Sequence, residues 1–290
     1  MIESQLEDAI AAATGEAAVI VSTTARGGGS INEARIATLA DGRRYFFKTN
    51  ARADRLPGMF GAEYRALELL GAAAAIRVPV PIAASTDFIV MEAFEAHRPV
   101  PDWQEQMGRQ LACLHQATRR DHFGLDFDNF IGTTPQSNAP LEDWVTFWRA
   151  RRLEPQLELF AADGNQSDPL IALGGRLSEY LDEVLAEPAE PAVLLHGDLW
   201  SGNAAADERG APIIYDPASY YGRREAEIGM MRMFGGFDDH CYAAYAEVWP
   251  LADGSEQRIA VYGLYHELNH LNLFGHGYYD RCVATMRAVL

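Results

Sequence analysis

The first third of the chain contains short runs in which apolar and polar residues alternate, a pattern typical of half-buried strands. Two further segments have apolar residues every three to four positions and predict amphipathic helices. The predicted helices cover residues 4–14 and 59–70, and the predicted strands cover residues 17–23, 34–39, 43–48 and 88–91. A turn at Asp41-Gly42 separates two of the strands, so we expect a small antiparallel sheet with helices beside it.

From Asp102 onward the apolar spacing becomes helical, and Asp102 is expected to cap the first helix. Helices are predicted at residues 103–118, 144–160, 169–185 and 225–234, and residues 238–290 are expected to be helical. The pattern predicts an α+β protein with two lobes. A small N-lobe with an antiparallel sheet covers residues 1–92, and a mostly helical C-lobe covers residues 93–290, with the hinge near Glu92.

Residues 193–219 interrupt the helical pattern with the sequence VLLHGDLWSGNAAADERGAPIIYDPAS. A short apolar strand leads into a polar loop, and a second apolar strand ends at Asp216. Asp198 and Asn203 are five positions apart, which is the D-x-x-x-x-N spacing of the catalytic loop in phosphoryl-transfer enzymes. His196 stands two residues before the aspartate, as in that motif, with Gly197 in place of its arginine.

In that motif the aspartate accepts the proton of the attacking hydroxyl group and the asparagine holds a magnesium ion. Asp216 has the position of the second magnesium-binding aspartate, and oxygen ligands of this kind suit a hard cation. The alternative is a polar turn in which Asp198 and Asn203 serve only turn geometry. The combination of His196, the spacing and the later Asp216 favours phosphoryl transfer from ATP with Mg²⁺.

The chain contains a single lysine, Lys48, at the end of the third predicted strand. A lysine at this place would contact the α- and β-phosphates of ATP and needs a carboxylate partner on the following helix. Glu63 is the expected partner, and Glu68 is the alternative. Because arginine has a wide planar head group, retention of one lysine among many arginines indicates a specific role.

A glycine-rich turn precedes Lys48, and glycines let backbone N–H groups approach phosphates closely. A flexible turn without a ligand is the alternative for this segment. The candidates for covering the phosphates are Gly27, Gly28, Gly29, Ser30 and Asn32. At the expected hinge, backbone groups of Glu92 and Phe94 are the candidates for binding adenine.

Composition narrows the class of protein. The net charge is −17, which argues against general binding to nucleic acids or anionic membranes. Three widely spaced cysteines (Cys113, Cys241 and Cys282) lack a metal-ligand pattern and indicate a reducing compartment. The acidic N-terminus differs from a signal peptide, and no apolar run is long enough to span a bilayer. We therefore expect a cytoplasmic monomer.

The segments HGDLWSGN and IIYDPASYYG resemble the fructosamine (ketosamine) kinase family, a branch of the aminoglycoside-phosphotransferase-like, protein-kinase-like fold. The resemblance implies ATP- and Mg²⁺-dependent phosphorylation of a ketosamine, at O3, in a cleft between the lobes. The product would be unstable and would shed the sugar, freeing the amine. The substrate could be a ribulosamine, an erythrulosamine or a fructosamine, either as a small molecule or on a glycated protein.

The resemblance also implies residue roles. Asp198 would be the base, Asn203 and Asp216 would bind magnesium, and Glu227 would support the catalytic loop. A family segment F-G-…-N-F-I-G-…-P-Q-x-N and a helix Y-x-x-x-H-x-x-N-H-x-N-x-F-G are present. The implied contacts to the acceptor come from Trp200, Gln136, Asn138, His266, His270 and Asn272. Ser30 replaces a cysteine that many family members carry, which argues against a thiol switch or disulfide-linked dimer at that loop.

Three alternatives differ from this interpretation. The chain could be a kinase of another small alcohol, such as an aminoglycoside or choline, or a nucleotide-binding pseudokinase. His266-Glu-Leu-Asn-His270 also matches the H-E-x-x-H motif of zinc metalloproteases, with His276 as a third ligand. The longer zinc motif has a glycine where this chain has Leu273, so the kinase interpretation of this helix is preferred. Loop or core packing is the alternative role for Trp200, Gln136 and Asn138.

Overall fold

The computed structural model describes residues 2–27, 32–50 and 55–290, and these divide into two compact units. Unit 1 comprises Met1–Trp103 and Gly202–Pro217, and unit 2 comprises Gln104–Ser201 and Ala218–Leu290. The first boundary, at Trp103, coincides with the start of α3 (Trp103–Ala117) and follows the hinge expected near Glu92. The segment Gly202–Pro217 groups with the N-terminal unit, although residues 104–201, which precede it in sequence, belong to unit 2. The sequence did not predict that residues 202–217 belong to the N-terminal unit.

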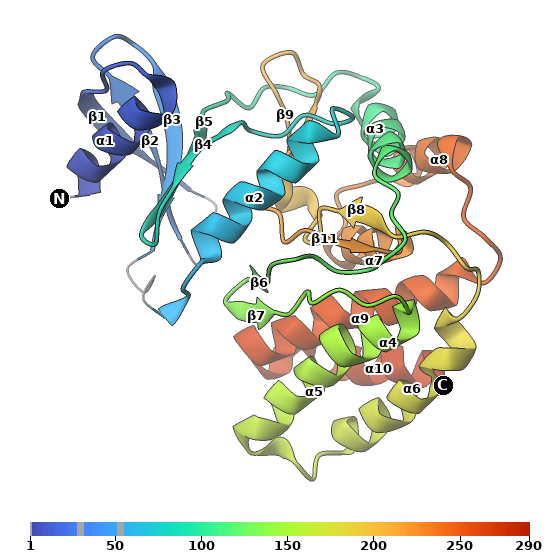
Figure 1. Cartoon of the computed structure of the whole chain (residues 1–290). Coiled ribbons are helices and arrows are strands. Elements are labelled where there is room, and N and C mark those ends of the chain that lie inside the picture. The colour runs from blue at the N-terminus through green and yellow to red at the C-terminus, as the bar shows by residue number, and fades with distance from the viewer. Residues whose placement is uncertain (1, 28–31, 51–54) are drawn as a thin grey trace. The chain divides into compact units, whose positions relative to one another are not determined.

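Unit 1 is built on a five-stranded antiparallel sheet with the order β1-β2-β3-β5-β4. The strands are β1 (Ile20–Arg26), β2 (Glu33–Leu39), β3 (Arg44–Thr49), β4 (Pro81–Ala84) and β5 (Phe88–Glu92). Helix α1 (Ile2–Thr14) and helix α2 (Met59–Ala72) accompany the sheet. In Figure 1 the sheet lies between the two helices.

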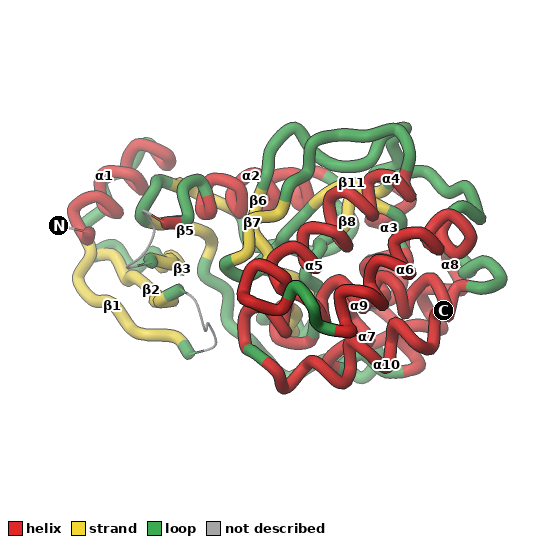
Figure 2. The backbone as a smooth tube through the Cα atoms, turned by 90° about the horizontal axis from the view of Figure 1, so that it is seen from below, coloured by secondary structure: helices red, strands yellow, loops and turns green. Residues whose placement is uncertain are grey.

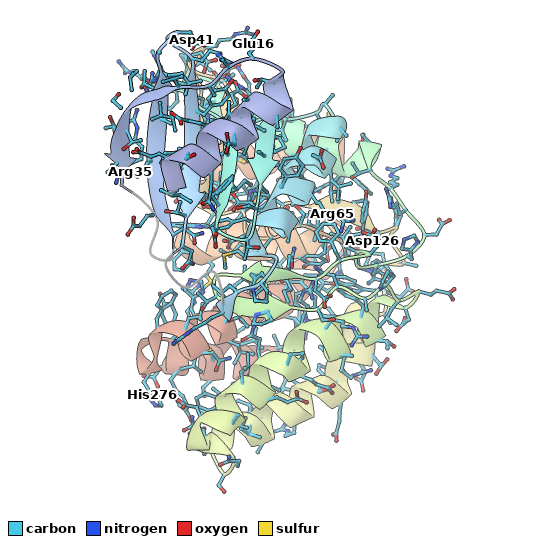
Figure 3. All side chains as sticks on the ribbon, turned by 60° about the vertical axis from the view of Figure 1, so that its left-hand side comes forward. Glu16, Arg35, Asp41, Arg65, Asp126 and His276 are labelled. Carbon is cyan, nitrogen blue, oxygen red and sulfur yellow. The ribbon has the colours of Figure 1, made fainter. Side chains whose placement is uncertain are left out.

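Helix α1 packs its apolar side on one face of this sheet. Leu6 and Ile10 form a buried cluster with Leu39, Phe47 and Val90. Side chains of successive strand residues point to opposite faces, so Lys48 points away from this cluster and towards α2. At the edge of the unit, Arg43 pairs with Glu16 and Asp41, whose side chains are labelled near one another in Figure 3.

A short hairpin of β9 (Ala204–Ala206) and β10 (Pro212–Ile214) completes unit 1. Arg77 joins this hairpin to the main sheet. Its guanidinium group pairs with Asp207 at 2.6 Å, Glu208 at 2.9 Å and Glu92 at 2.7 Å, and its carbonyl group accepts the N–H of Ile214. Three carboxylates on one cation explain why this hairpin belongs to unit 1.

Unit 2 is mostly helical, as the sequence predicts. After α3 (Trp103–Ala117), its helices are α4 (Trp144–Trp148), α5 (Glu154–Phe160), α6 (Pro169–Leu185), α7 (Glu225–Phe234), α8 (Asp239–Val248), α9 (Ser255–Phe274) and α10 (Tyr279–Val289). Two small hairpins pair β6 (Asn129–Ile131) with β7 (Thr134–Gln136), and β8 (Val193–Leu195) with β11 (Tyr220–Gly222).

Helix α9 is the central helix of unit 2 and contacts α5, α7 and α10, which lie beside it in Figure 2. The approach of α7 to α9 is close because both helices carry glycine at the crossing. A Cβ atom on Gly229 would lie 2.8 Å from the backbone nitrogen of Gly263. Trp144 packs against Tyr262 of α9 and donates a hydrogen bond to its hydroxyl group at 2.8 Å.

The predicted α+β class is confirmed, and most long elements lie where the apolar spacing placed them. The predicted helix at residues 144–160 is interrupted by a π-helical segment, Arg149–Leu153. Of the short strands, β8 and β10 lie at the two apolar runs in residues 193–219 that predict strands. The strands β4, β6, β7, β9 and β11 were not predicted, because such short segments carry too little periodicity and Pro81 reads as a break. In the described residues no helix is long and apolar enough to cross a membrane.

Candidate active site

The loop that follows β8 carries His196, Gly197 and Asp198, all in unit 2. Gly197 has a φ of +83°, and a Cβ atom there would lie 2.2 Å from the carbonyl oxygen of Ala218. A glycine is therefore required, because any side chain would collide with the backbone of the loop before β11 and strain its own backbone. The carbonyl group of His196 accepts the N–H of Ala218 at 2.9 Å, which ties the loop to the segment after Asp216.

Glu227, in the first turn of α7, holds the other side of the same loop. Its buried carboxylate accepts the backbone N–H groups of His196 and of Gly197, the second at 3.0 Å. His115 lies behind it, with Nε2 3.9 Å from the carboxylate and Nδ1 2.8 Å from the hydroxyl oxygen of Tyr245. Glu227 thus fixes the backbone that presents Asp198.

Replacing Glu227 with leucine should leave two buried N–H groups without an acceptor. Each such group costs about 1–3 kcal/mol, so we expect the free energy of unfolding to fall by at least about 2 kcal/mol. Glu227→Gln keeps one acceptor oxygen and should be affected less. Urea unfolding of the two variants measures this difference, and a leucine variant as stable as the wild type would contradict the assignment.

Unit 1 brings together the predicted lysine, its helix partner and the later aspartate. The ammonium group of Lys48 lies 2.7 Å from the Glu63 carboxylate and also contacts the carboxylate of Asp216. Lys48 and Glu63 are buried, whereas the side chain of Asp216 is 40% exposed. Burial acts to lower the pKa of Lys48, but the charges of Asp216 and Glu63 outweigh it and raise the pKa above its ordinary value. The lysine is therefore a permanent cation here.

Asn203 and Asp216, the two expected magnesium ligands, also lie together in unit 1. The amide nitrogen of Asn203 donates to the Asp216 carbonyl group at 3.5 Å, and the carbonyl group of Asn203 accepts the N–H of Tyr215 at 3.0 Å. Asp216 has a φ of +61°, which is unusual for a residue with a side chain and is often found at functional sites. A carboxylate and an amide on one short hairpin fit a hard cation such as Mg²⁺.

The residues expected to contact the nucleotide are only partly described. Gly28, Gly29 and Ser30 lie outside the described residues. Gly27 is exposed, and Asn32 accepts a hydrogen bond from Asn50 at 2.9 Å.

At the end of β5, the N–H of Glu92 donates to the Val80 carbonyl group and its carboxylate binds Arg77. These groups of Glu92 are thus not offered to adenine. The ring of Phe94 contacts the ring of Tyr215, with centroids 5.6 Å apart.

Near Asp198 in sequence, Trp200 belongs to an aromatic series on unit 2. Its ring centroid lies 5.5 Å from that of Phe234, which in turn lies 4.9 Å from His270. His270 also contacts Phe274 and Tyr278. Phe234 is 39% exposed and Phe274 is 56% exposed, so part of this series faces solvent. Sequence reasoning missed Phe234, which reads as an ordinary last apolar residue of α7.

The other residues expected to contact the acceptor form hydrogen bonds within unit 2. Gln136 and Asn138 are buried, and both bond the Asn129 side-chain oxygen, at 2.7 and 2.9 Å. Asn272 donates to the side-chain oxygen of Gln156 at 2.7 Å. Gln136 and Asn138 are buried and hydrogen-bonded within unit 2, so their contacts support a packing role.

His266 is also buried, and burial, with the nearby charges of His270 and Arg152, lowers the pKa of His266 to about 3. Its neighbour Glu267 accepts hydrogen bonds from Arg281 at 2.6 Å and Thr285 at 2.9 Å. Figure 3 shows His276 at the outer edge of unit 2, where it is exposed. In the part of the chain that the structure describes, no group of three or more His, Cys, Asp or Glu residues could hold a metal ion. The H-E-x-x-H segment is a packed part of α9.

Known proteins resemble this chain over nearly its whole length. The chain is 41% identical over 270 residues to a chloroplastic protein-ribulosamine 3-kinase of Oryza sativa subsp. japonica, covering 91% of this chain and 77% of that protein. A crystal structure of a candidate fructosamine-3-kinase from Thermobifida fusca superposes with a TM-score of 0.89 at 32% identity, covering 98% of each chain.

A spectinomycin phosphotransferase superposes with a TM-score of 0.58 at 14% identity, covering 99% of this chain and 93% of the other, and so shares the fold alone. The fold is therefore that of the kinase-like phosphotransferases. The family model described as "Fructosamine kinase" matches residues 2–290. The chain belongs to the fructosamine kinase family.

Proposed function

We propose that this protein is an ATP-dependent kinase that phosphorylates O3 of a ketosamine, with a ribulosamine as the first candidate substrate. The structural observation that carries the proposal is the contact of Lys48 with both Glu63 and Asp216 beside Asn203. Membership of the fructosamine kinase family, with a relative named protein-ribulosamine 3-kinase, gives the acceptor class.

Each group in the proposed reaction has one role. Asp198 orients the ketosamine hydroxyl group and accepts its proton as the γ-phosphoryl group is transferred. Glu227 keeps the Asp198 loop in place. Lys48 binds phosphate oxygens, and Glu63 keeps its ammonium group charged and directed. Mg²⁺, held by Asn203 and Asp216, would neutralise charge on the phosphates.

Phosphorylation of the ketosamine at O3 would give an unstable product that loses the sugar and frees the amine. The enzyme would thus remove sugar adducts from amines. The exposed aromatic series around Trp200 supports an acceptor with an apolar ring face better than a polycationic aminoglycoside, which would call for an acidic pocket.

Trp200 gives a prediction about the acceptor alone. If its indole stacks on the sugar, Trp200→Ala should remove about 0.5–1.5 kcal/mol of binding, equivalent to a rise of roughly two- to tenfold in the KM for the ketosamine. The KM for ATP should remain within twofold of the wild type, and Trp200→Phe should retain most of the affinity. Steady-state kinetics with each substrate varied measures both. A change confined to ATP would contradict the assignment.

The proposal is tested by incubating the protein with Mg-ATP and separate ribulosyl-, erythrulosyl- and fructosyl-amines, an aminoglycoside and choline. We expect ADP formation that depends on a ketosamine. Turnover with only the aminoglycoside or choline would favour a kinase of another small alcohol. Nucleotide binding without transfer to any acceptor would indicate a pseudokinase.

A further inference from the structure

Arg152 is a completely buried arginine in unit 2 that has no role in the proposed reaction so far. It lies in the π-helical segment Arg149–Leu153 that interrupts the predicted helix, and such segments are frequent at functional sites. Among the described residues no carboxylate lies within ion-pair distance of its guanidinium group, in contrast to Arg224 and Arg258, which pair with Glu190 and Glu225. A buried cation without an anion requires another explanation.

Aromatic rings and neutral acceptors surround the Arg152 guanidinium group. Its central carbon lies 4.0 Å from the ring centroid of Tyr220 and 4.9 Å from that of Phe147. It donates to the carbonyl group of Ser137 at 2.8 Å and to the side-chain oxygen of Asn138 at 2.7 Å. Cation–π contacts and these bonds offset part of the cost of burial.

The acceptor Asn138 begins a connected set of side-chain amides, the amide network, made of Asn138, Asn129 and Gln136. The Asn138 amide nitrogen donates to the Asn129 oxygen at 2.9 Å, and the Gln136 amide nitrogen donates to the same oxygen at 2.7 Å. The Asn129 nitrogen donates to the Ser219 carbonyl group at 2.8 Å, and the Gln136 nitrogen donates to the Ala218 carbonyl group at 3.2 Å.

The direction of the bonds in the amide network is fixed at both ends, by the guanidinium group of Arg152 and by backbone carbonyl groups. A guanidinium group can only donate, so Asn138 must turn its oxygen to Arg152 and its nitrogen to Asn129. The carbonyl groups of Phe127 and Ser219, which can only accept, hold the nitrogens of Asn138 and Asn129 in the same direction. Without the guanidinium group the buried Asn138 oxygen would lose this charged donor, and the network would lose its anchor at this end.

The backbone that receives these bonds is the one that supports the Asp198 loop. The N–H of Ala218 donates to the His196 carbonyl group, and the Ala218 carbonyl group lies where a side chain on residue 197 would be. Tyr265 donates to the Gln136 oxygen at 2.7 Å, and the charge of Asp198 acts on this buried tyrosine. The network therefore connects Arg152 to the segment that supports the loop.

We propose that Arg152 is a positioning residue for phosphoryl transfer: its guanidinium group anchors the amide network, which holds residues 218–219 and thereby the Asp198 loop. This inference rests on the proposed kinase function for its kinetic consequences, but its structural part does not. Gln136 and Asn138, expected from the sequence to contact the acceptor, act in it as supports.

Kinetics of Arg152→Gln and Arg152→Lys test the inference. Glutamine is shorter and uncharged, so the Asn138 oxygen loses its charged donor and the network loses its anchor, and we expect kcat to fall roughly 10- to 100-fold from loop misplacement. The KM for ATP should stay within twofold. Arg149→Gln is the matched control, because Arg149 lies in the same π-helical segment but pairs with the exposed Asp182. That control should retain wild-type kcat.

Arg152→Lys adds a pH readout that a purely structural role would not give. An introduced ammonium group is also donor-only, but a buried lysine without an anion has a lowered pKa, by up to about 3–5 units. Below that pKa a charged donor anchors the network, and above it the neutral amine donates a weaker hydrogen bond. We therefore expect kcat of Arg152→Lys, relative to wild type, to fall roughly tenfold between pH 6 and pH 9 as the amine loses its proton.

The two tyrosines and the histidine nearest this site do not change charge in that pH range. Burial raises the pKa of Tyr220 to about 12 and also raises the pKa of Tyr265 above its ordinary value. Burial lowers the pKa of His266 to about 3. The wild-type arginine remains charged throughout, so a new pH dependence in the lysine variant belongs to the introduced amine.

Hydrogen exchange provides the readout that needs no substrate. In Arg152→Gln the backbone amides of His196, Gly197 and Ala218 should exchange faster than in wild type. Mass spectrometry of peptides covering residues 194–200 and 217–222 measures this exchange. Unchanged exchange there, or a flat pH profile for Arg152→Lys at wild-type kcat, would overturn the inference. If the wild type phosphorylates no acceptor, the proposed function fails, and the exchange measurement still decides the role of Arg152.

Discussion

Asp198→Asn should lower kcat by about 10²- to 10⁴-fold and leave the affinity for ATP nearly unchanged. The substitution keeps the size and polarity of the side chain but removes the group that accepts the proton. Since Asp198 is proposed to contact the acceptor hydroxyl group and not the nucleotide, only the transfer step should suffer. Steady-state kinetics and calorimetric titration with a non-hydrolysable ATP analogue measure the two quantities.

A matched control for this prediction is Asp182→Asn. Asp182 is exposed on α6 and pairs with Arg149 at the surface, so its neutralisation should leave kcat unchanged and cost less than about 1 kcal/mol of stability. If Asp198→Asn keeps most of the wild-type activity, Asp198 is not the base. If it loses ATP affinity as well, the residue acts on the nucleotide instead.

Lys48→Met should affect both activity and stability. Loss of one charged donor to developing negative charge typically costs about 10²- to 10³-fold, and we expect a loss of this size in kcat/KM for ATP. The substitution also leaves the Glu63 carboxylate buried without its partner. Breaking a buried pair costs about 3–5 kcal/mol, and the lower end applies because Asp216 is partly exposed and Glu63 can take up a proton.

The double variant Lys48→Met/Glu63→Leu separates these two effects. Removing both partners of the pair leaves no buried carboxylate at Glu63, so much of the lost stability should return while activity stays low. Urea unfolding and ATP-dependent kinetics of the two single variants and the double variant complete the cycle. Recovery of activity together with stability would show that the lysine serves packing and not phosphate binding.

The sequence allowed the pair of Lys48 and Glu63, and Asp216 as a site residue, to be predicted because each lies at a recognisable place in a periodic element. The contact of Lys48 with Asp216 was not predicted. Lys48 ends a strand, Glu63 lies on the next amphipathic helix, and Asp216 ends an apolar run. The α+β class and the long helices followed from the same periodicity. Such features depend on local sequence and can be read without knowing the tertiary structure.

Features set by long-range packing could not be predicted in this way. Arg152 stands in the run Arg149-Ala-Arg-Arg152, which reads as a solvated surface, yet the π-helical segment contains it fully buried. Gln136 and Asn138 read as possible ligands because burial is not visible in a polar, turn-rich segment. The grouping of residues 202–217 with unit 1 depends on Arg77, which pairs with Asp207 and Glu208 of that segment. These two partners lie far from Arg77 in sequence.

Phosphorus–proton correlation NMR of the reaction mixture tests the central claim most directly. With Mg-ATP and a ribulosamine, the wild-type protein should produce a new phosphate ester whose phosphorus couples to the proton on C3 of the sugar, and Asp198→Asn should produce almost none. A phosphate ester at another carbon, ATP hydrolysis without any ester, or equal product from the Asp198→Asn variant would contradict the account.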